Sequence, residues 1–289
     1  MLRELLADVR LGLRMLLRSP GFTTVALVTI ALGIGANTAM FSIVHGVLLK
    51  PLPYPDADRI VILRENNLSR GFTSFTVAPD NFQDWQTRNR SLDILAAYQG
   101  ASVTHTGGAR PERLVALRVS DGFLEILGGQ PARGRGITKE DLDPSGEGVV
   151  VLTHGFWQRT FGGDSNVVGR MMVLDGAAHT VVGVLPQNWR PFTRQRVDLF
   201  VPLRRQAFWS RGSHFLGGLG RLKPGGTLQQ ARADFAAIAS VLEAEHPDTN
   251  KGWGAVVRPL DDVLLGSTRP QLLTFLAMVG LVLVICCAN

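Results

Sequence analysis

The Lys, Ser and His residues of this sequence lack the neighbouring residues that nucleotide binding and the common catalytic motifs require. A nucleotide-binding P-loop places Lys directly after Gly, because the Gly lets the backbone close on phosphates that the Lys then neutralises. The four lysines follow Leu, Thr, Leu and Asn instead: Lys50, Lys139, Lys223 and Lys251. No Ser has Gly both two residues before and two residues after it, and no His begins an HExxH motif. We therefore expect no catalytic residues, no bound cofactor and no enzymatic activity.

The cysteines and histidines form no metal-binding or redox pattern. The two cysteines, Cys286 and Cys287, are adjacent, so they supply neither a disulfide framework nor a Cys-x-x-Cys site. The histidines of the central region are spread over separate expected elements: His105, His154, His179, His214 and His246. We expect each of them at the surface or at a helix cap, and we expect no metal site, because a site would require these separate elements to converge.

The composition excludes two further classes of protein. With 45% hydrophobic and 19% charged residues, the chain is too apolar to be disordered. Its net charge of +6 comes mainly from Arg, without a Lys/Arg-rich block, zinc-ligand spacing or RNP-like motif. The charge therefore does not indicate nucleic-acid binding.

Two uncharged stretches are long enough to cross a bilayer. Residues 19–49 contain no Lys, Arg, Asp or Glu, and residues 271–289 are also uncharged. About 20 apolar helical residues span the hydrocarbon core, so both stretches are predicted transmembrane helices. A cleaved signal peptide is the alternative for the first, but its apolar character continues to Leu48 and Leu49 without a small-residue cleavage site. The second stretch has no charged flank after it, and we expect the front part of a longer, multi-pass protein.

Residues 1–18 form the pattern of an amphipathic helix at the cytoplasmic face. Leucines such as Leu2, Leu6 and Leu13 fall on one side of a helical projection. The arginines gather on the other side: Arg3, Arg10, Arg14 and Arg18. Such a helix lies in the membrane interface with its arginines at anionic headgroups, and an ordinary surface helix is the alternative.

The first predicted span also carries residues suited to helix packing. Ala31, Gly35 and Ala39 follow one another at intervals of four, where small side chains let another helix approach closely, although a lipid-facing stripe remains the alternative. Asn37 is expected at a helix interface because an unpaired amide in hydrocarbon is costly.

The region between the spans, residues 50–268, reads as an α+β domain. A strand at 59–64, a helix at 79–89 and a strand at 94–104 form one β-α-β unit. A strand at 215–222, a helix that begins with the Thr227–Gln230 capping box and a strand at 254–260 form a second. Together the units predict a split βαβ sandwich with its helices on one face of the sheet. The segment between them, about residues 106–214, is a strand-rich insertion that includes a hairpin turning at Asp175-Gly176.

One stretch of the insertion, residues 189–211, alternates arginines with aromatic residues. Arg and aromatic side chains are enriched at binding hot spots, so the stretch is a candidate partner surface. Its residues of interest are Arg194, Arg196, Arg204, Arg205 and Trp209. The alternative is a solvated connection between strands whose apolar residues lie in the core.

Several long strings resemble the MacB-like ABC-transporter permeases, and most closely the orphan permeases that carry this unit twice. They include RMLLRSPGFTTVALVTIALGIGANTAMFSIVHGVLLKPLPYPDADRIV at 14–61, APDNFQDWQ at 78–86, VVVLTHGFWQRTFGGDSNVVGRMMVLDGAAHTVVGVLP at 149–186 and RGSHFLGGLGRLKPGGTLQQA at 211–231. The resemblance covers the chain from end to end. It implies a bacterial inner-membrane protein whose central domain is periplasmic, with a porter-like subdomain and an inserted β-rich one.

The same resemblance implies a permease that relies on a separate ATP-binding subunit and couples its ATP hydrolysis to movement of the periplasmic domain, for export. Its expected partners are that subunit, the lipid bilayer, and a periplasmic partner or second permease unit. A membrane-anchored receptor or sensor is the alternative, and a copurifying ATPase would distinguish the two. An ectoenzyme fits least, because no nucleophile, metal or paired-carboxylate arrangement is visible.

Overall fold

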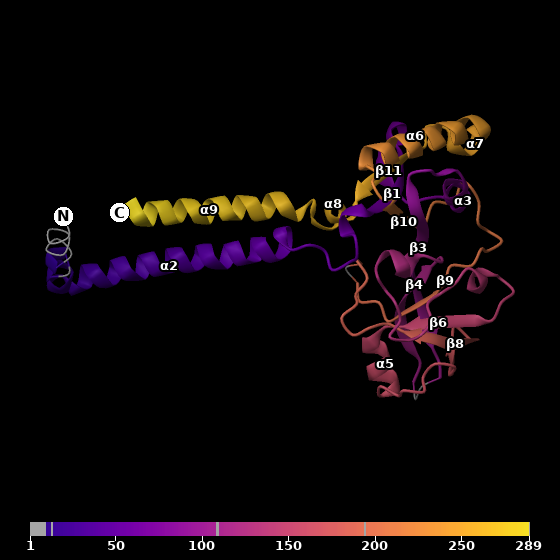
Figure 1. Cartoon of the computed structure of the whole chain (residues 1–289), viewed down its shortest axis with the longest axis horizontal. Helices are drawn as coiled ribbons and strands as arrows, with labels where there is room; N and C mark the ends of the chain where they lie inside the picture. Colours follow the sequence, from indigo (N-terminus) through magenta and orange to yellow (C-terminus); the bar gives the residue numbers. More distant parts are fainter. Residues whose placement is uncertain (1–9, 13, 108–109, 194, 289) are drawn as a thin grey trace. The chain divides into compact units, whose positions relative to one another are not determined.

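The structure is a computed structural model that describes residues 10–12, 14–107, 110–193 and 195–288. It divides into two compact units (Figure 1). The first contains the described residues up to Leu52 and those from Leu265 onward, and the second runs from Pro53 to Leu264.

The first unit consists mainly of two long helices. Helix α2 spans Pro20–Val44 and continues as a π-helical turn, η1, over His45–Leu49. Pro20 occupies its first turn, where the missing N–H of proline costs nothing. Helix α9 spans Thr268–Ala288, and it runs beside α2 (Figure 1). Two segments, Pro20–Leu48 and Thr268–Cys286, are long and apolar enough to cross a membrane, as the sequence predicts.

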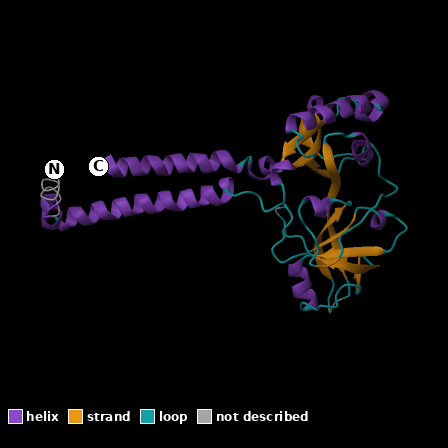
Figure 2. Cartoon of the chain, viewed as in Figure 1, coloured by secondary structure: helices purple, strands orange, loops and turns teal. Residues whose placement is uncertain are grey.

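The second unit is a mixed α/β domain whose strands form one sheet (Figure 2). Its strands are β1 (Ile60–Asn67), β2 (Phe72–Phe75), β3 (Leu92–His105), β4 (Glu112–Val119), β5 (Arg133–Gly134), β6 (Gly148–Leu152), β7 (Met171–Leu174), β8 (Ala177–Val184), β9 (Leu199–Pro202), β10 (Gly217–Leu222) and β11 (Gly254–Pro259). Its helices are η2 (Ala57–Arg59), η3 (Leu68–Arg70), α3 (Pro79–Arg88), α4 (Phe123–Ile126), η4 (Glu140–Leu142), α5 (His154–Phe161), α6 (Leu228–Glu245), α7 (Pro247–Asn250) and α8 (Leu260–Leu265).

The part of the sheet built from the two ends of this unit has the strand order β11-β1-β10-β3. Helix α3 lies in the connection from β1 to β3, and β10 lies between these two strands in the sheet. Helix α6 lies in the connection from β10 to β11, and β1 lies between those two strands. Strand β10 fits between its neighbours because it is rich in glycine. A Cβ added to Gly218 would lie 2.8 Å from Cβ of Leu63.

Helices α3 and α6 bury their apolar residues against one face of these four strands. Helix α6 begins at the predicted capping box, in which Thr227 accepts a hydrogen bond from the backbone N–H of Gln230. Its buried side includes Ala231, Phe235 and Leu242, and Phe235 meets the edge of Trp85 from α3 at 5.4 Å between ring centroids. This packing forms the first hydrophobic core.

A second core lies in the middle of the chain, between β4, β6, β8 and β9 and helix α5. The predicted hairpin joins β7 to β8, and both Asp175 and Gly176 have positive φ, as a two-residue hairpin turn requires. The long strand β3 belongs to both cores. Leu95 packs in the first and Val103 in the second, while β10 pairs with its first half and β4 with its second half.

Candidate functional site

The arginines of the predicted interfacial helix are only partly described. Residues 10–12 and 14–18 are helical, and Arg10, Arg14 and Arg18 are exposed. Arg3 lies outside the described residues. A role at the membrane interface stays a prediction for all four.

Asn37 lies at the contact between α2 and α9. Its side-chain amide donates hydrogen bonds to the carbonyls of Gly33, at 2.9 Å, and Val279, at 3.1 Å. Gly33 allows the close approach, since a Cβ at this position would lie 3.2 Å from Cδ1 of Leu283. The pairing of Gly33 with Leu283 and of Asn37 with Val279 shows that the two helices run antiparallel.

The stripe of small residues lies elsewhere on α2. Ala31, Gly35 and Ala39 are exposed, and a Cβ at Gly35 would meet no atom within 4 Å. The residue in the same helix that lets α9 approach is Gly33. Packing of the stripe against a further helix stays a prediction.

Several arginines of the stretch 189–211 bind to other parts of the second unit. The guanidinium of Arg204 donates to the carbonyls of Asp141, Gly146 and Glu147 at 2.9, 2.9 and 2.5 Å. Arg205 forms an ion pair with Asp80 at 2.8 Å. Arg204 therefore holds the loop before β6 in place, whatever else the stretch does.

The other candidate residues of this stretch differ in how exposed their side chains are. Trp209 is half-buried and packs on Phe215, with ring centroids 5.5 Å apart, whereas Arg196 is exposed. Arg194 lies outside the described residues. A partner surface here stays a prediction, and Arg196 is the described arginine most available to serve it.

A buried polar cluster lies between β1 and the start of α3, where no site is predicted from the sequence. Glu65, which is 1% exposed, accepts hydrogen bonds from the backbone N–H of Ala78 at 3.0 Å and from the Asn81 amide at 2.6 Å. Nδ1 of His214 lies 2.5 Å from the same carboxylate. Asn81 in turn exchanges hydrogen bonds with the buried Asn250.

The prediction that each histidine lies at the surface or at a helix cap is wrong for His214. Its side chain is 8% exposed and stacks on Trp253, with ring centroids 4.0 Å apart. His105 is also buried, at 7% exposure. His246 does cap a helix, because it ends α6 and precedes α7. Within the described residues no group of three His, Cys, Asp or Glu side chains could hold a metal ion.

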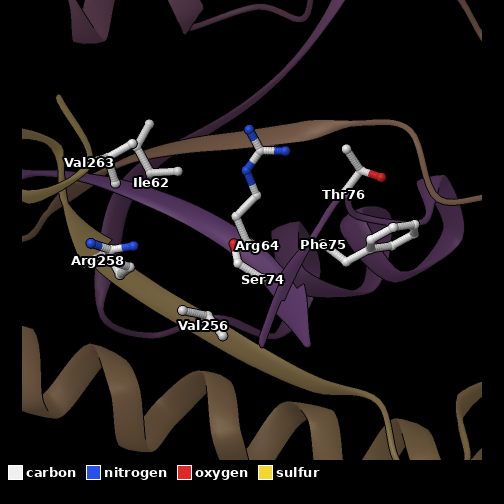
Figure 3. Close-up of a pocket in the computed structure, with 8 residues that line it drawn as sticks. All are labelled: Ile62, Arg64, Ser74, Phe75, Thr76, Val256, Arg258 and Val263. Atoms are coloured by element: carbon white, nitrogen blue, oxygen red, sulfur yellow. The ribbon is translucent and has the colours of Figure 1, made fainter. Parts of the chain in front are cut away.

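The opposite face of β1 lines a pocket of about 380 Å³ (Figure 3). Side chains alternate between the two faces of a strand, so Val61, Leu63 and Glu65 face the helices while Ile62 and Arg64 face the pocket. The neighbouring strands β11 and β2, the residue that follows β2 and helix α8 supply the other lining residues. They are Ser74, Phe75, Thr76, Val256, Arg258 and Val263.

Arg64 and Arg258 reach this pocket from adjacent strands. In the register of β1 and β11, Arg64 is opposite Val256 and Arg258 is opposite Ile62, which makes the two arginines diagonal neighbours. Arg64 donates a hydrogen bond to the hydroxyl of Tyr98 at 3.3 Å. Neither site has a clear signal in the sequence, because the four consecutive apolar residues Ile60–Leu63 do not show which of Arg64 and Glu65 faces the core.

Comparisons with known proteins agree on one family. Residues 23–238 match the family described as MacB-like periplasmic core domain. The chain is 26% identical over 172 residues to the Macrolide export ATP-binding/permease protein MacB of Chromobacterium violaceum. That match covers 59% of this chain and 23% of the other protein, so the chain spans less than a quarter of that relative's length.

Solved structures share the fold at low sequence identity. The periplasmic region of MacB from Actinobacillus actinomycetemcomitans superimposes with a TM-score of 0.53 at 13% identity and covers 72% of this chain and 91% of that one. A domain of a putative permease protein from Porphyromonas gingivalis gives 0.53 at 16% identity, over 71% and 92% of the two chains. The extracellular domain of the noncanonic ABC-type transporter YknZ from Gram-positive bacteria gives 0.50 at 16%, over 68% and 99%. Because the family match extends over more than half of its length, this chain belongs to the MacB-like periplasmic core domain family.

Proposed function

We propose that the chain is the N-terminal part of a permease subunit of an ABC-type transporter or mechanotransmission complex. In this proposal a separate subunit hydrolyses ATP, and the resulting motion of the membrane helices moves the second unit, for export. The observation that carries the proposal is the match of residues 23–238 to the MacB-like periplasmic core domain, together with membrane-length helices at Pro20–Leu48 and Thr268–Cys286. The two helices contact each other through Asn37, which supports their movement as a pair.

The chain has a short connection at each side of the core domain through which such motion would pass. The first leads from η1 to β1, and the second is helix α8, which follows β11 directly and precedes α9. Strands β1 and β11 are paired along Val61–Asn66 and Gly254–Pro259, so both connections enter adjacent strands. A displacement of the helix pair would therefore act on one edge of the sheet.

The proposal includes a division of the core domain, residues 50–268, into two subdomains. The porter-like subdomain is the split βαβ part with strands β11, β1, β10 and β3 and helices α3 and α6. The β-rich insertion is about residues 106–214. The separation of the buried side chains into two hydrophobic cores supports this division.

The proposed location is the bacterial inner membrane, with several spans and with the core domain in the periplasm. Residues 1–18 would lie at the cytoplasmic face. The proposed partners are an ATP-binding subunit, the bilayer, and a periplasmic partner or a second permease unit. The chain itself would have no enzymatic activity, in keeping with the missing Gly-Lys phosphate-binding loop.

Affinity purification of the full-length protein from its native membranes tests the function. We expect ATP hydrolysis to copurify with it and to be lost when the P-loop lysine of the copurifying subunit is replaced by Ala. The chain purified alone should neither bind nor hydrolyse ATP. Native membranes that yield no ATP-binding subunit would favour the alternative, a membrane-anchored receptor or sensor.

A further inference from the structure

The two arginines in the pocket of Figure 3 differ from the other arginines of the same part of the sheet. Arg59 pairs with Asp56 and Asp93, and Arg221 pairs with Asp93 and Glu125. Arg64 and Arg258 form no ion pair with any carboxylate in the described ranges of the chain. The pocket therefore holds two positive charges that the surrounding residues leave uncompensated.

The groups nearest to these arginines cannot supply the missing negative charge. Burial raises the pKa of Tyr98 above its ordinary value and outweighs the opposing effect of Arg64, so the phenol that accepts the Arg64 hydrogen bond stays neutral. Glu65 follows Arg64 in the sequence but points to the opposite face, where Ala78, Asn81 and His214 hold its carboxylate. Arg64 is therefore left without an anionic partner among the described residues, and Arg258, which is exposed, likewise pairs with none.

The rest of the pocket suits an apolar group. Ile62 and Val256 form part of its wall on the strands, and Val263 from α8 and Phe75 from β2 complete the apolar lining (Figure 3). Ser74 and Thr76 add hydroxyl groups, of which that of Thr76 already donates to the carbonyl of His214. A volume of about 380 Å³ lies within the range of small-molecule sites.

We propose that this pocket binds a small organic anion in which a phosphate or carboxylate is joined to an apolar group. The guanidinium fork of arginine matches both anions, because two parallel N–H groups can donate to two oxygens. Arg64 and Arg258 would hold the anionic group, and Ile62, Val256 and Val263 would cover the apolar group.

The test uses the full chain in nanodiscs of zwitterionic phosphatidylcholine, with phenyl phosphate as the probe. Binding is measured by saturation-transfer NMR titration. We expect phenyl phosphate to bind saturably and at least tenfold more tightly than either phenyltrimethylammonium, which carries the wrong charge, or inorganic phosphate, which lacks the apolar group. Equal affinities for phenyl phosphate and phenyltrimethylammonium would overturn the proposal, and so would equal affinities for phenyl phosphate and inorganic phosphate.

Substitutions of the two pocket arginines test whether phenyl phosphate binds in this pocket. Arg64→Gln and Arg258→Gln should each weaken binding of phenyl phosphate at least tenfold. Arg90→Gln, which removes an exposed arginine outside the pocket lining, should leave it unchanged. Unchanged binding in both pocket variants would overturn the proposal.

A second substitution guards against a pocket variant that fails to fold. Val263 is 39% exposed, so Val263→Glu places a carboxylate at the rim without opening a core. The new carboxylate should pair with the arginines and abolish probe binding, whereas Val168→Glu, at a residue of 40% exposure outside the lining, should have no effect. Full binding in a folded Val263→Glu variant would contradict the assignment.

A competition experiment separates two sources of the natural anion. Displacement of phenyl phosphate by water-soluble dihexanoyl phosphatidylglycerol would identify a lipid headgroup as the source of the phosphate. Saturable probe binding without displacement would identify a soluble anion. Both results support the pocket as an anion site.

Discussion

At the scale of single residues, the second unit places opposite charges back to back on one strand. Glu65 is buried and fully paired, while Arg64 faces a pocket and has no anionic partner in the described chain. A buried carboxylate is stable only when hydrogen bonds and positive charge replace the water it has lost. Glu65 therefore stabilises the fold of the domain, whereas Arg64 is available to bind a ligand.

The paired Glu65 leads to a prediction about stability. Glu65→Ala should lower the free energy of unfolding of the second unit by about 3 kcal/mol, because it removes one member of a buried network and leaves its donors unpaired. Glu112→Ala is the matched control, since this carboxylate is 47% exposed and contributes little. Urea unfolding followed by tryptophan fluorescence measures the change, because all five tryptophans lie in the second unit.

His214→Phe refines this experiment. The phenyl ring can keep the stacking on Trp253 but cannot form a hydrogen bond with Glu65, so a loss of stability in this variant reports the loss of the contact between Nδ1 of His214 and the Glu65 carboxylate. Equal stability of Glu65→Ala and Glu112→Ala would show that the buried cluster does not stabilise the domain.

At the scale of elements, the packing of α2 on α9 depends on the missing side chain of Gly33. Without a Cβ, the backbones approach closely enough for Asn37 to reach a carbonyl of the other helix. Small residues at helix contacts serve this purpose in membranes, where apolar burial alone does not drive association. The register of the two helices is therefore set by one glycine and one amide.

This register can be tested with a disulfide. A Cβ at residue 33 would lie 3.9 Å from Cβ of Cys286, within the range that a disulfide requires. Gly33→Cys should therefore cross-link to Cys286 on mild oxidation, in a background where Cys287 is Ser. Protection of both thiols from maleimide-polyethylene glycol after denaturation measures the bond.

Gly35→Cys provides the comparison, because no atom lies within 4 Å of a Cβ there. It should leave both thiols reactive under the same oxidation. Cross-linking of equal extent at residues 33 and 35 would contradict the helix register described above.

Elements with strong local signals could be predicted from the sequence. The capping box of α6 and the hairpin turn at Asp175-Gly176 both form where the local pattern indicates. Strand β5 was missed, since it is two residues long and exists only through its pairing with β8. The pairing of His214 with Glu65 was also missed, because it joins residues that only the folded sheet brings together.

At the scale of the whole molecule, the central proposal is that the two units occupy different compartments. Ser145 is exposed in the loop before β6, so Ser145→Cys gives the second unit one accessible thiol. The native cysteines lie in the other unit, in α9. A membrane-impermeant maleimide should label Cys introduced at this position in intact spheroplasts, because a periplasmic domain is open to the medium after removal of the outer membrane.

The unsubstituted chain supplies the background of this measurement, since its only thiols lie in an apolar helix. Labelling that appears only after the spheroplasts are lysed would place the domain in the cytoplasm and would reverse the proposed orientation.

The distant pairing of β1 has a consequence for the order in which the chain folds during synthesis. Strand β1 begins at Ile60, but its partners β10 and β11 begin at Gly217 and Gly254. The second core, in contrast, draws on residues from Val103 to Val201, which leave the ribosome before β10 does, so this core can form first. Until β10 and β11 emerge, the four consecutive apolar residues at the start of β1, Ile60–Leu63, have no partner strand, because β2 pairs only with Glu65 and Asn67. Such an exposed apolar segment is a template for incorrect pairing. The nascent chain is thus most prone to aggregation late in its synthesis, after most of its residues have already folded.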